Sequence, residues 1–190
     1  MPVLARLAGT MRGADLSGLR TGQTPRREIY RTNKTRLYRY IGAPRHRTPL
    51  LFVPNLGISR PWVFDLLPGR SFVEYMVREG FDFYLLDWGV FGPEDDAMTF
   101  EDCVTGTLPR AWRRVLEAAA SPGLSIIGYC MGTALAASLA ASRPESPLRA
   151  FVNLAGPVDF TKAGLLVRWL DRRWFDADRL VDALGSIPPS

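Results

Sequence analysis

Residues 124–142, LSIIGYCMGTALAASLAAS, decide the fold of this 190-residue chain. Their centre, Gly128-Tyr129-Cys130-Met131-Gly132, has the form G-x-C-x-G, which is the pattern of a nucleophile elbow with cysteine in the position usually held by serine. The apolar residues 124–127 predict a buried strand, and the alanine- and leucine-rich residues after Cys130 predict a helix. Cys130 is therefore expected on the sharp turn between the two, the context that this motif requires.

The two glycines of the motif, Gly128 and Gly132, fit the demands of such a turn. The turn strains the nucleophile's backbone and brings strand and helix together, so side chains at the flanking positions have no room. The alternative is a glycine-rich connection in any α/β protein, with Cys130 as an inert thiol. The five residues alone leave both interpretations open.

Length and composition predict one domain in a reducing compartment. The chain is 47% hydrophobic, enough for one core. Two cysteines make no disulfide framework, and the first residues lack a signal-peptide pattern, which favours the cytoplasm. The stretch from Ala118 to Ser142 is uncharged, but Gly, Ser and Pro122 interrupt it. We therefore expect a strand, a turn and a helix there, and no transmembrane segment.

Positive charge is concentrated early in the chain. Residues 1–47 carry 11 Lys and Arg against 2 Asp and Glu, a net of +9, whereas residues 48–190 carry 13 against 17, a net of −4. We interpret residues 1–23 as a basic, mobile leader, either simply solvated or touching an anionic partner such as a nucleotide-bearing substrate, a membrane or a granule surface. No aromatic residues are interleaved as in nucleic-acid modules, so we expect no nucleic-acid partner.

The rest of the chain alternates between strand and helix patterns. Residues 27–30 and 35–40 alternate polar with apolar side chains and predict an antiparallel hairpin. An unbroken apolar run at 50–53 predicts a strand buried on both faces, and 83–86 and 150–154 predict further buried strands of a parallel sheet. These elements predict an α/β fold.

Two helices are expected between these strands, and a third amphipathic segment follows them. One spans 71–79, with Ser71 as N-cap and Glu74 at the capping-box position. The other is a long helix that starts at Thr99 and is kinked or restarted at Pro109. Cys103 near its start is interpreted as structural. Apolar residues at near-helical spacing between 165 and 175 predict an amphipathic segment. We expect its apolar face to pack against another part of the protein.

Five segments, in their order and spacing, resemble one protein family. They are PLLFVPNLGISRP (49–61), FYLLDWG (83–89), GYCMGTALA (128–136), NLAGPVDF (153–160) and LVDALGSIPPS (180–190). Together they resemble a polyhydroxyalkanoate synthase, the bacterial polyester polymerase of the α/β-hydrolase fold, and most of all its shorter heteromeric class. Thr133 departs from the small residue expected after the elbow, and Ser59 stands where asparagine is expected before Arg60-Pro61.

The resemblance implies an incomplete α/β-hydrolase fold, with its N-terminal core at 24–160 and the start of a cap at 161–190. Family members carry their catalytic aspartate and histidine in the second half, after the cap. The only histidine here, His46, precedes the first parallel strand, whereas the base of this fold follows the nucleophile and the acid. We therefore predict that His46 is a surface loop residue, that Asp159 is structural, and that the chain is the N-terminal half of a synthase.

The resemblance also implies the chemistry of the site. Cys130 would be the nucleophile that attacks a 3-hydroxyacyl-coenzyme A thioester, without metal or cofactor. The oxyanion hole would use the Met131 N–H and one N–H from the loop 55–58, with Ile58 as the candidate. Implied partners are a second synthase subunit and the polyester granule surface, in an oligomer. Without a base, we expect little catalysis by this chain alone and slow alkylation of Cys130 by iodoacetamide.

Two other functions remain open at this stage. The chain could be a non-catalytic interaction or granule-associated protein derived from the synthase, binding through an apolar edge. A cysteine-elbow thioesterase or dienelactone-type hydrolase is the third possibility; it would release free acid and not polymer. The DWG segment at 87–89 and the PVDF segment at 157–160 argue against the hydrolase.

Overall fold

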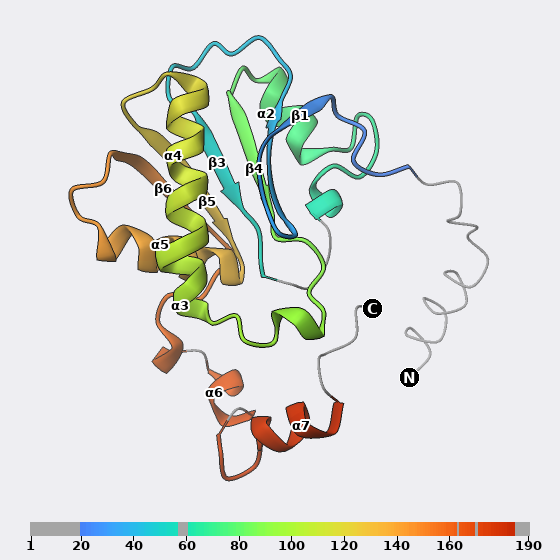
Figure 1. Cartoon of the computed structure of the whole chain (residues 1–190), viewed down its shortest axis with the longest axis vertical. Coiled ribbons are helices and arrows are strands. Elements are labelled where there is room, and N and C mark those ends of the chain that lie inside the picture. The colour runs from blue at the N-terminus through green and yellow to red at the C-terminus, as the bar shows by residue number, and fades with distance from the viewer. Residues whose placement is uncertain (1–19, 57–60, 163, 170, 185–190) are drawn as a thin grey trace.

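A single six-stranded sheet organises the fold (Figure 1). The computed structural model describes residues 20–56, 61–162, 164–169 and 171–184. The strand order is β1-β2-β4-β3-β5-β6. The strands are β1 (Arg26–Thr32), β2 (Thr35–Tyr40), β3 (Leu50–Val53), β4 (Phe83–Asp87), β5 (Leu124–Tyr129) and β6 (Leu148–Leu154). The first two strands and the β2–β4 pair are antiparallel, and β4, β3, β5 and β6 run parallel.

Helices cover both faces of this sheet (Figure 1). The α-helices are α2 (Phe72–Arg78), α3 (Phe100–Asp102), α4 (Leu108–Ala119), α5 (Met131–Ser142), α6 (Leu165–Trp169) and α7 (Ala177–Leu184). Short 3-10 turns occur at Pro61–Phe64, Pro93–Asp95 and Phe160–Lys162, and one π-helical turn lies at Cys103–Thr107. Alternation along the strands divides the core in two. Leu51 and Val53 face α4 and α5, whereas Leu50 and Phe52 face α2.

The predicted hairpin, the strands before the elbow and the helix after it are all confirmed. Ser71 caps α2 as predicted, because its hydroxyl accepts a hydrogen bond from the Glu74 N–H at 2.9 Å. The reciprocal half of the predicted capping box does not form. The Glu74 carboxylate instead accepts from the Gly69 N–H at 2.6 Å, and so stabilises the turn before the helix.

The predicted long helix from Thr99 is divided into three parts. Thr99 forms a capping box with Asp102 at the start of α3. A π-turn follows, in which the Leu108 N–H donates to the Cys103 carbonyl, and α4 restarts with Pro109 in its first turn. Proline has no N–H to donate to a preceding carbonyl, so this wider turn absorbs the break. The backbone at Thr107 and Leu108 stays in the right-handed helical region, so Pro109 is accommodated by the π-turn within a continuous run of helical residues.

The strand β6 differs from the prediction that it would be buried. It pairs with β5 on one side and, among the described residues, with nothing on the other. Phe151 packs on the core beneath α4 and α5, but on the opposite face Val152 is 46% exposed and Leu154 37% exposed. The prediction of a buried strand is therefore wrong for β6, since none of its residues is fully buried and the described residues leave the face with Val152 and Leu154 exposed.

The C-terminal part of the described chain packs little against the sheet. In Figure 1, α6 and α7 lie beyond the end of the sheet and do not cover either face. Trp169 and Trp174 are 67% and 82% exposed, so the predicted amphipathic piece covers nothing among the described residues. No helix of the described ranges is long and apolar enough to cross a bilayer. The predicted leader, residues 1–23, lies almost wholly outside the described residues.

Asp65 ties the start of the chain to the α2 layer. Its side chain is buried and accepts three hydrogen bonds, from the Thr24 N–H, the Thr24 hydroxyl and the Ser71 hydroxyl, at 2.9, 2.6 and 2.7 Å. The residue lies directly after the turn Pro61–Phe64 and so anchors that turn to the start of the described chain and to α2. The sequence offered no sign of this role, because all of its partners are brought together by the fold.

We expect Asp65→Ala to lower the free energy of unfolding by about 3 kcal/mol, since it leaves buried donors without an acceptor. Chemical denaturation followed by circular dichroism measures this change. Asp96→Ala removes an exposed carboxylate and should stay within about 0.5 kcal/mol of the unaltered chain. Equal effects of the two substitutions would contradict the role of Asp65.

Candidate active site

The turn between β5 and α5 holds Cys130 in a strained conformation. Its backbone has φ 52° and ψ −124°, a region that costs a residue with a side chain about 1–3 kcal/mol. The Cys130 N–H donates to the Leu154 carbonyl at 3.0 Å, and the Cys130 carbonyl accepts from the Thr133 N–H at 3.0 Å. The predicted strand, turn and helix around Cys130 are thus confirmed. The thiol is partly exposed at the C-terminal edge of the parallel strands.

Three glycines, and not two, allow this turn to close. A Cβ on Gly128 would stand 2.5 Å from the Thr133 Cα, and one on Gly132 would stand 2.5 Å from the Pro54 carbonyl oxygen and closer still to that of Val53. A Cβ on Gly156 would lie 2.5 Å from the Cys130 carbonyl oxygen. The prediction for Gly128 and Gly132 is confirmed. The role of Gly156, after β6, was missed because only the tertiary structure places it against the elbow.

Thr133 stabilises the elbow from within. It is fully buried, and its hydroxyl donates to the Gly128 carbonyl at 2.6 Å, with Asn153 Oδ1 at 3.3 Å. The Asn153 side chain in turn accepts from the Gly156 N–H at 2.9 Å and donates to the Gly156 carbonyl at 3.0 Å. The departure at Thr133 therefore adds a hydrogen bond across the turn, which joins β5 and α5 at the position where the glycines make them meet.

The first of the predicted oxyanion donors, the Met131 N–H, directly follows Cys130 at the start of α5. Met131 is the first residue of α5, and among the described residues nothing accepts a hydrogen bond from its N–H. The second predicted donor, Ile58, lies outside the described residues, as do Ser59 and Arg60. Met131 thus has a free donor beside Cys130, at the positive end of the helix dipole.

Aromatic residues hold the described chain on either side of residues 57–60. At the start, the Trp88 indole N–H donates to the Pro54 carbonyl at 3.1 Å. At the end, Phe64 packs on Tyr129, beside Cys130, with ring centroids 4.9 Å apart. The Trp of the DWG segment was used only as a marker of resemblance. Its hydrogen bond gives it a physical task, which is to hold Pro54 directly after β3.

His46 and Asp159 do not form a catalytic pair with Cys130. His46 is exposed in the loop before β3, its ring 4.4 Å from that of Phe81. Because β3 and β5 are parallel, that loop is at the opposite edge of the sheet from Cys130. Asp159 is exposed and accepts from the Thr161 N–H and hydroxyl, and these bonds, with that from Lys162, lower the pKa of its carboxyl. Both predictions, of a surface histidine and a structural aspartate, are confirmed.

Cys103 is a buried thiol in the π-turn, as predicted for a structural residue. Burial, with a small contribution from Asp102, raises the pKa of Cys103 to about 11. The described residues contain no cluster of His, Cys, Asp and Glu able to hold a metal ion. Since Cys103 is buried and Cys130 is partly exposed, Cys130 is the cysteine that a substrate can reach.

Iodoacetamide at about pH 8 should leave Cys103 unmodified in the folded chain, because only about one thiol in a thousand is ionised there and solvent does not reach it. Peptide mapping by mass spectrometry measures the modification of each cysteine separately. In concentrated guanidinium chloride both cysteines should react. Alkylation of Cys103 at the same rate with and without denaturant would contradict its burial.

Comparison with known proteins identifies the family of this chain. The profile described as alpha/beta hydrolase fold matches residues 55–187. The chain belongs to the α/β-hydrolase fold family. A solved structure of this fold, the Francisella virulence factor BioJ, is similar with a TM-score of 0.59 at 16% identity, over 91% of this chain and 58% of that one. The predicted fold class is confirmed, and a likeness at this identity shows the fold alone.

Closer relatives are subunits of a polymerase. The chain is 35% identical over 173 residues to the poly(3-hydroxyalkanoate) polymerase subunit PhaC of Allochromatium vinosum, covering 88% of this chain and 48% of the relative. It is 33% identical over 183 residues to the subunit of the same name from Haloferax mediterranei, covering 95% and 37%. The predicted resemblance to the N-terminal region of such a synthase is confirmed. The chain spans less than half the length of either relative.

Proposed function

We propose that this α/β-hydrolase chain is the nucleophile-bearing part of a polyhydroxyalkanoate synthase, which transfers 3-hydroxyacyl groups from coenzyme A to a growing polyester. The observation that carries this proposal is Cys130 at a nucleophile elbow in a chain similar to polymerase subunits over most of its length. A buried thiol in an ordinary connection would explain neither the partly exposed sulfur nor the free Met131 N–H.

In the proposed first step, the Cys130 thiolate attacks the thioester carbonyl carbon. The carbonyl oxygen becomes an oxyanion that the Met131 N–H stabilises, together with a donor from the loop at 55–58. The bond between the carbonyl carbon and the coenzyme A sulfur then breaks, coenzyme A leaves as a thiolate and takes up a proton, and the acyl group stays on Cys130. One thioester replaces another, so the acyl-enzyme is close in free energy to the substrate.

In the proposed second step, the hydroxyl of a 3-hydroxyacyl group attacks the acyl-enzyme and releases Cys130. That hydroxyl must lose its proton to a general base as the new ester bond forms. His46 cannot serve, because it lies at the opposite edge of the sheet. The proposal includes a general base supplied from outside the described residues. Without that base, the chain should form the acyl-enzyme slowly and should add few further acyl groups to the polyester.

Incubation with 3-hydroxybutyryl-coenzyme A tests the proposal. We expect intact mass spectrometry to find one acyl group per chain, attached at Cys130, with coenzyme A released in equal amount. Release of free 3-hydroxybutyrate, with no acyl-enzyme or oligomer, would instead indicate the cysteine-elbow hydrolase. Absence of both products, even when a PhaC relative is added as a source of the base, would overturn an enzymatic role.

A second candidate function, that of an interaction protein, is favoured by the exposed edge strand β6. Its free edge and its apolar face, with Val152 and Leu154, offer backbone and side-chain contacts to a further strand. In this proposal the occupant is a strand of a synthase subunit.

We expect Val152→Lys to reduce association of the chain with itself or with an added synthase subunit at least tenfold, because a charge on an edge strand opposes strand addition. Analytical ultracentrifugation measures both. Ile41→Lys, which places the same charge at a residue 60% exposed on the far side of the sheet, is the matched control. If the two variants associate equally, β6 is not the contact.

A further inference from the structure

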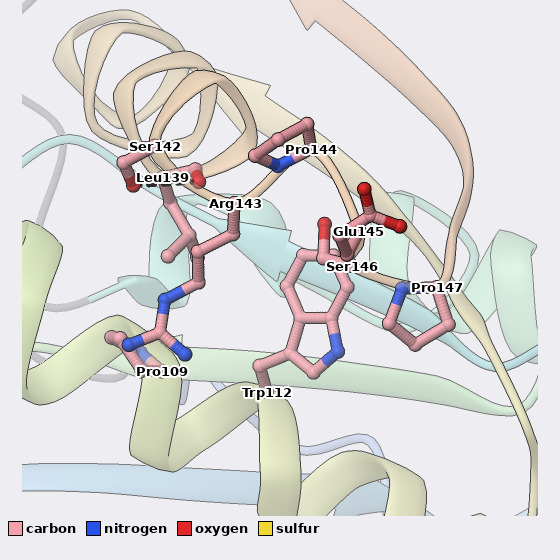
Figure 2. A pocket seen from close by; sticks show the side chains of 9 residues that line it. All are labelled: Pro109, Trp112, Leu139, Ser142, Arg143, Pro144, Glu145, Ser146 and Pro147. Carbon is pink, nitrogen blue, oxygen red and sulfur yellow. Dashed lines mark hydrogen bonds between the residues drawn. The ribbon is translucent and has the colours of Figure 1, made fainter.

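Two adjoining grooves lie on the helical face of the molecule, away from Cys130. The first, about 460 Å³ in volume, is formed where α4 meets the turn that leaves α5. Its walls are mostly apolar, with Trp112, Leu139 and three prolines among them. Figure 2 shows the Trp112 ring between Arg143 on one side and Pro147 on the other. Trp112 and Leu139 are almost fully buried, so the groove offers a narrow apolar strip, rimmed by prolines, with a charged group at one end.

The second groove, of about 350 Å³, continues from that charged end. It runs along the π-turn and the first half of α4 and shares Pro109, Trp112 and Arg143 with the first groove. Three arginines line it, Arg110, Arg113 and Arg143, and no acidic residue does. Among the described residues, none of these three side chains has an ion-pair partner, whereas Arg114, one position along, pairs with Glu117 at 3.0 Å.

Clustered guanidinium groups without carboxylates have a definite chemical preference. Each presents planar N–H donors that match the oxygens of a phosphate. Holding three like charges together is unfavourable until an anion neutralises them. The only acid of the pair of grooves, Glu145, lines the apolar groove, so an anionic head group is directed to the arginine end.

We propose that these grooves bind one anionic lipid, with its phosphate against Arg110, Arg113 and Arg143 and one acyl chain along the strip between Trp112 and the prolines of the first groove. Each volume lies in the range of small-molecule sites, roughly 300–1,000 Å³. The site is separate from the elbow. Cys130 precedes the first residue of α5 and the grooves lie at its last, about 18 Å away along a 12-residue helix. It therefore attaches the chain to a lipid-covered surface and does not hold the reacting acyl group.

Calorimetric titration of the full chain with dodecyl phosphate, kept monomeric, tests the site. We expect saturable binding to one site, at least tenfold tighter than that of inorganic phosphate and of dodecyl maltoside, which carries the same chain on a neutral head. Phosphate binding as tightly as dodecyl phosphate would overturn the proposal, because the apolar groove would then contribute nothing. Equal binding of dodecyl maltoside would do so as well.

Variants separate the two grooves. Dodecyl phosphate should bind at least tenfold more weakly to a variant that combines Arg110→Gln, Arg113→Gln and Arg143→Gln. The control combination Arg20→Gln, Arg47→Gln and Arg70→Gln, which removes the same charge from exposed residues elsewhere, should change it less than twofold. Ser146→Trp places a large side chain in the apolar groove and should weaken binding of dodecyl phosphate but not of inorganic phosphate. Circular dichroism confirms that each variant is folded.

Vesicles distinguish a lipid from other anions. The chain should co-sediment with phosphatidylcholine vesicles that contain phosphatidylglycerol. The fraction that co-sediments should fall at least fivefold for the arginine variant and for Ser146→Trp. If dodecyl phosphate binds but vesicles do not, the ligand is a free amphiphile and the lipid proposal fails. If vesicles bind both variants as well as the unaltered chain, or if an acidic peptide competes fully with dodecyl phosphate, the proposal also fails.

Discussion

Cys130→Ala should reduce the rate of acylation by 3-hydroxybutyryl-coenzyme A at least 1,000-fold, to the level of the uncatalysed reaction, because loss of a nucleophile removes the covalent route entirely. Coenzyme A release, followed with a thiol-specific dye after removal of the protein, measures the rate. Intact mass gives the matching loss of the acyl adduct.

Cys130→Ser should be almost as slow as Cys130→Ala in this chain. A serine hydroxyl needs a general base to become nucleophilic, whereas a thiol is partly ionised near neutral pH, and the one histidine is at the wrong edge of the sheet. Cys103→Ala is the matched control and should keep the full rate, because that thiol is buried. Full activity of Cys130→Ala, or loss of activity with Cys103→Ala in a folded protein, would contradict the assignment of Cys130.

Gly132→Ala should destabilise the fold by about 3 kcal/mol or more, although it adds one methyl group. The new Cβ would meet the backbone carbonyls of Val53 and Pro54, and neither can move without breaking the β3 pairing or the Trp88 hydrogen bond. For a chain of this length the melting temperature should fall by about 6–12 °C. Differential scanning calorimetry measures the change.

Gly106→Ala provides the control for this substitution. No atom lies within 4 Å of a Cβ built there, so the change should be neutral or stabilising by up to about 1 kcal/mol. Gly156→Ala should resemble Gly132→Ala, since it meets the Cys130 carbonyl and the Thr133 hydroxyl. If Gly132→Ala and Gly106→Ala have the same melting temperature, the close approach of α5 to β3 is not a constraint on the fold.

Local patterns in the sequence were enough to predict much of this protein. Apolar runs of four residues predicted β3 and β4, alternation predicted the hairpin β1–β2, and G-x-C-x-G predicted the turn at Cys130. These features depend on residues close together in the chain, whose backbone preferences and side-chain periodicity act before any tertiary contact forms. For the same reason the position of His46, ahead of the first parallel strand, already excluded it as the base.

Other features were decided by the tertiary structure alone. The sheet order makes β6 an edge strand, and no described element covers the face with Val152 and Leu154, so neither side chain is buried. Gly156 meets the elbow, and Trp88 holds Pro54, only because segments far apart in the chain become neighbours. The three arginines of the proposed lipid site also come from α4 and from the turn after α5, which meet in space. Sequence periodicity encodes which face of an element is apolar, but which segment covers that face depends on packing between elements, and no local pattern encodes it.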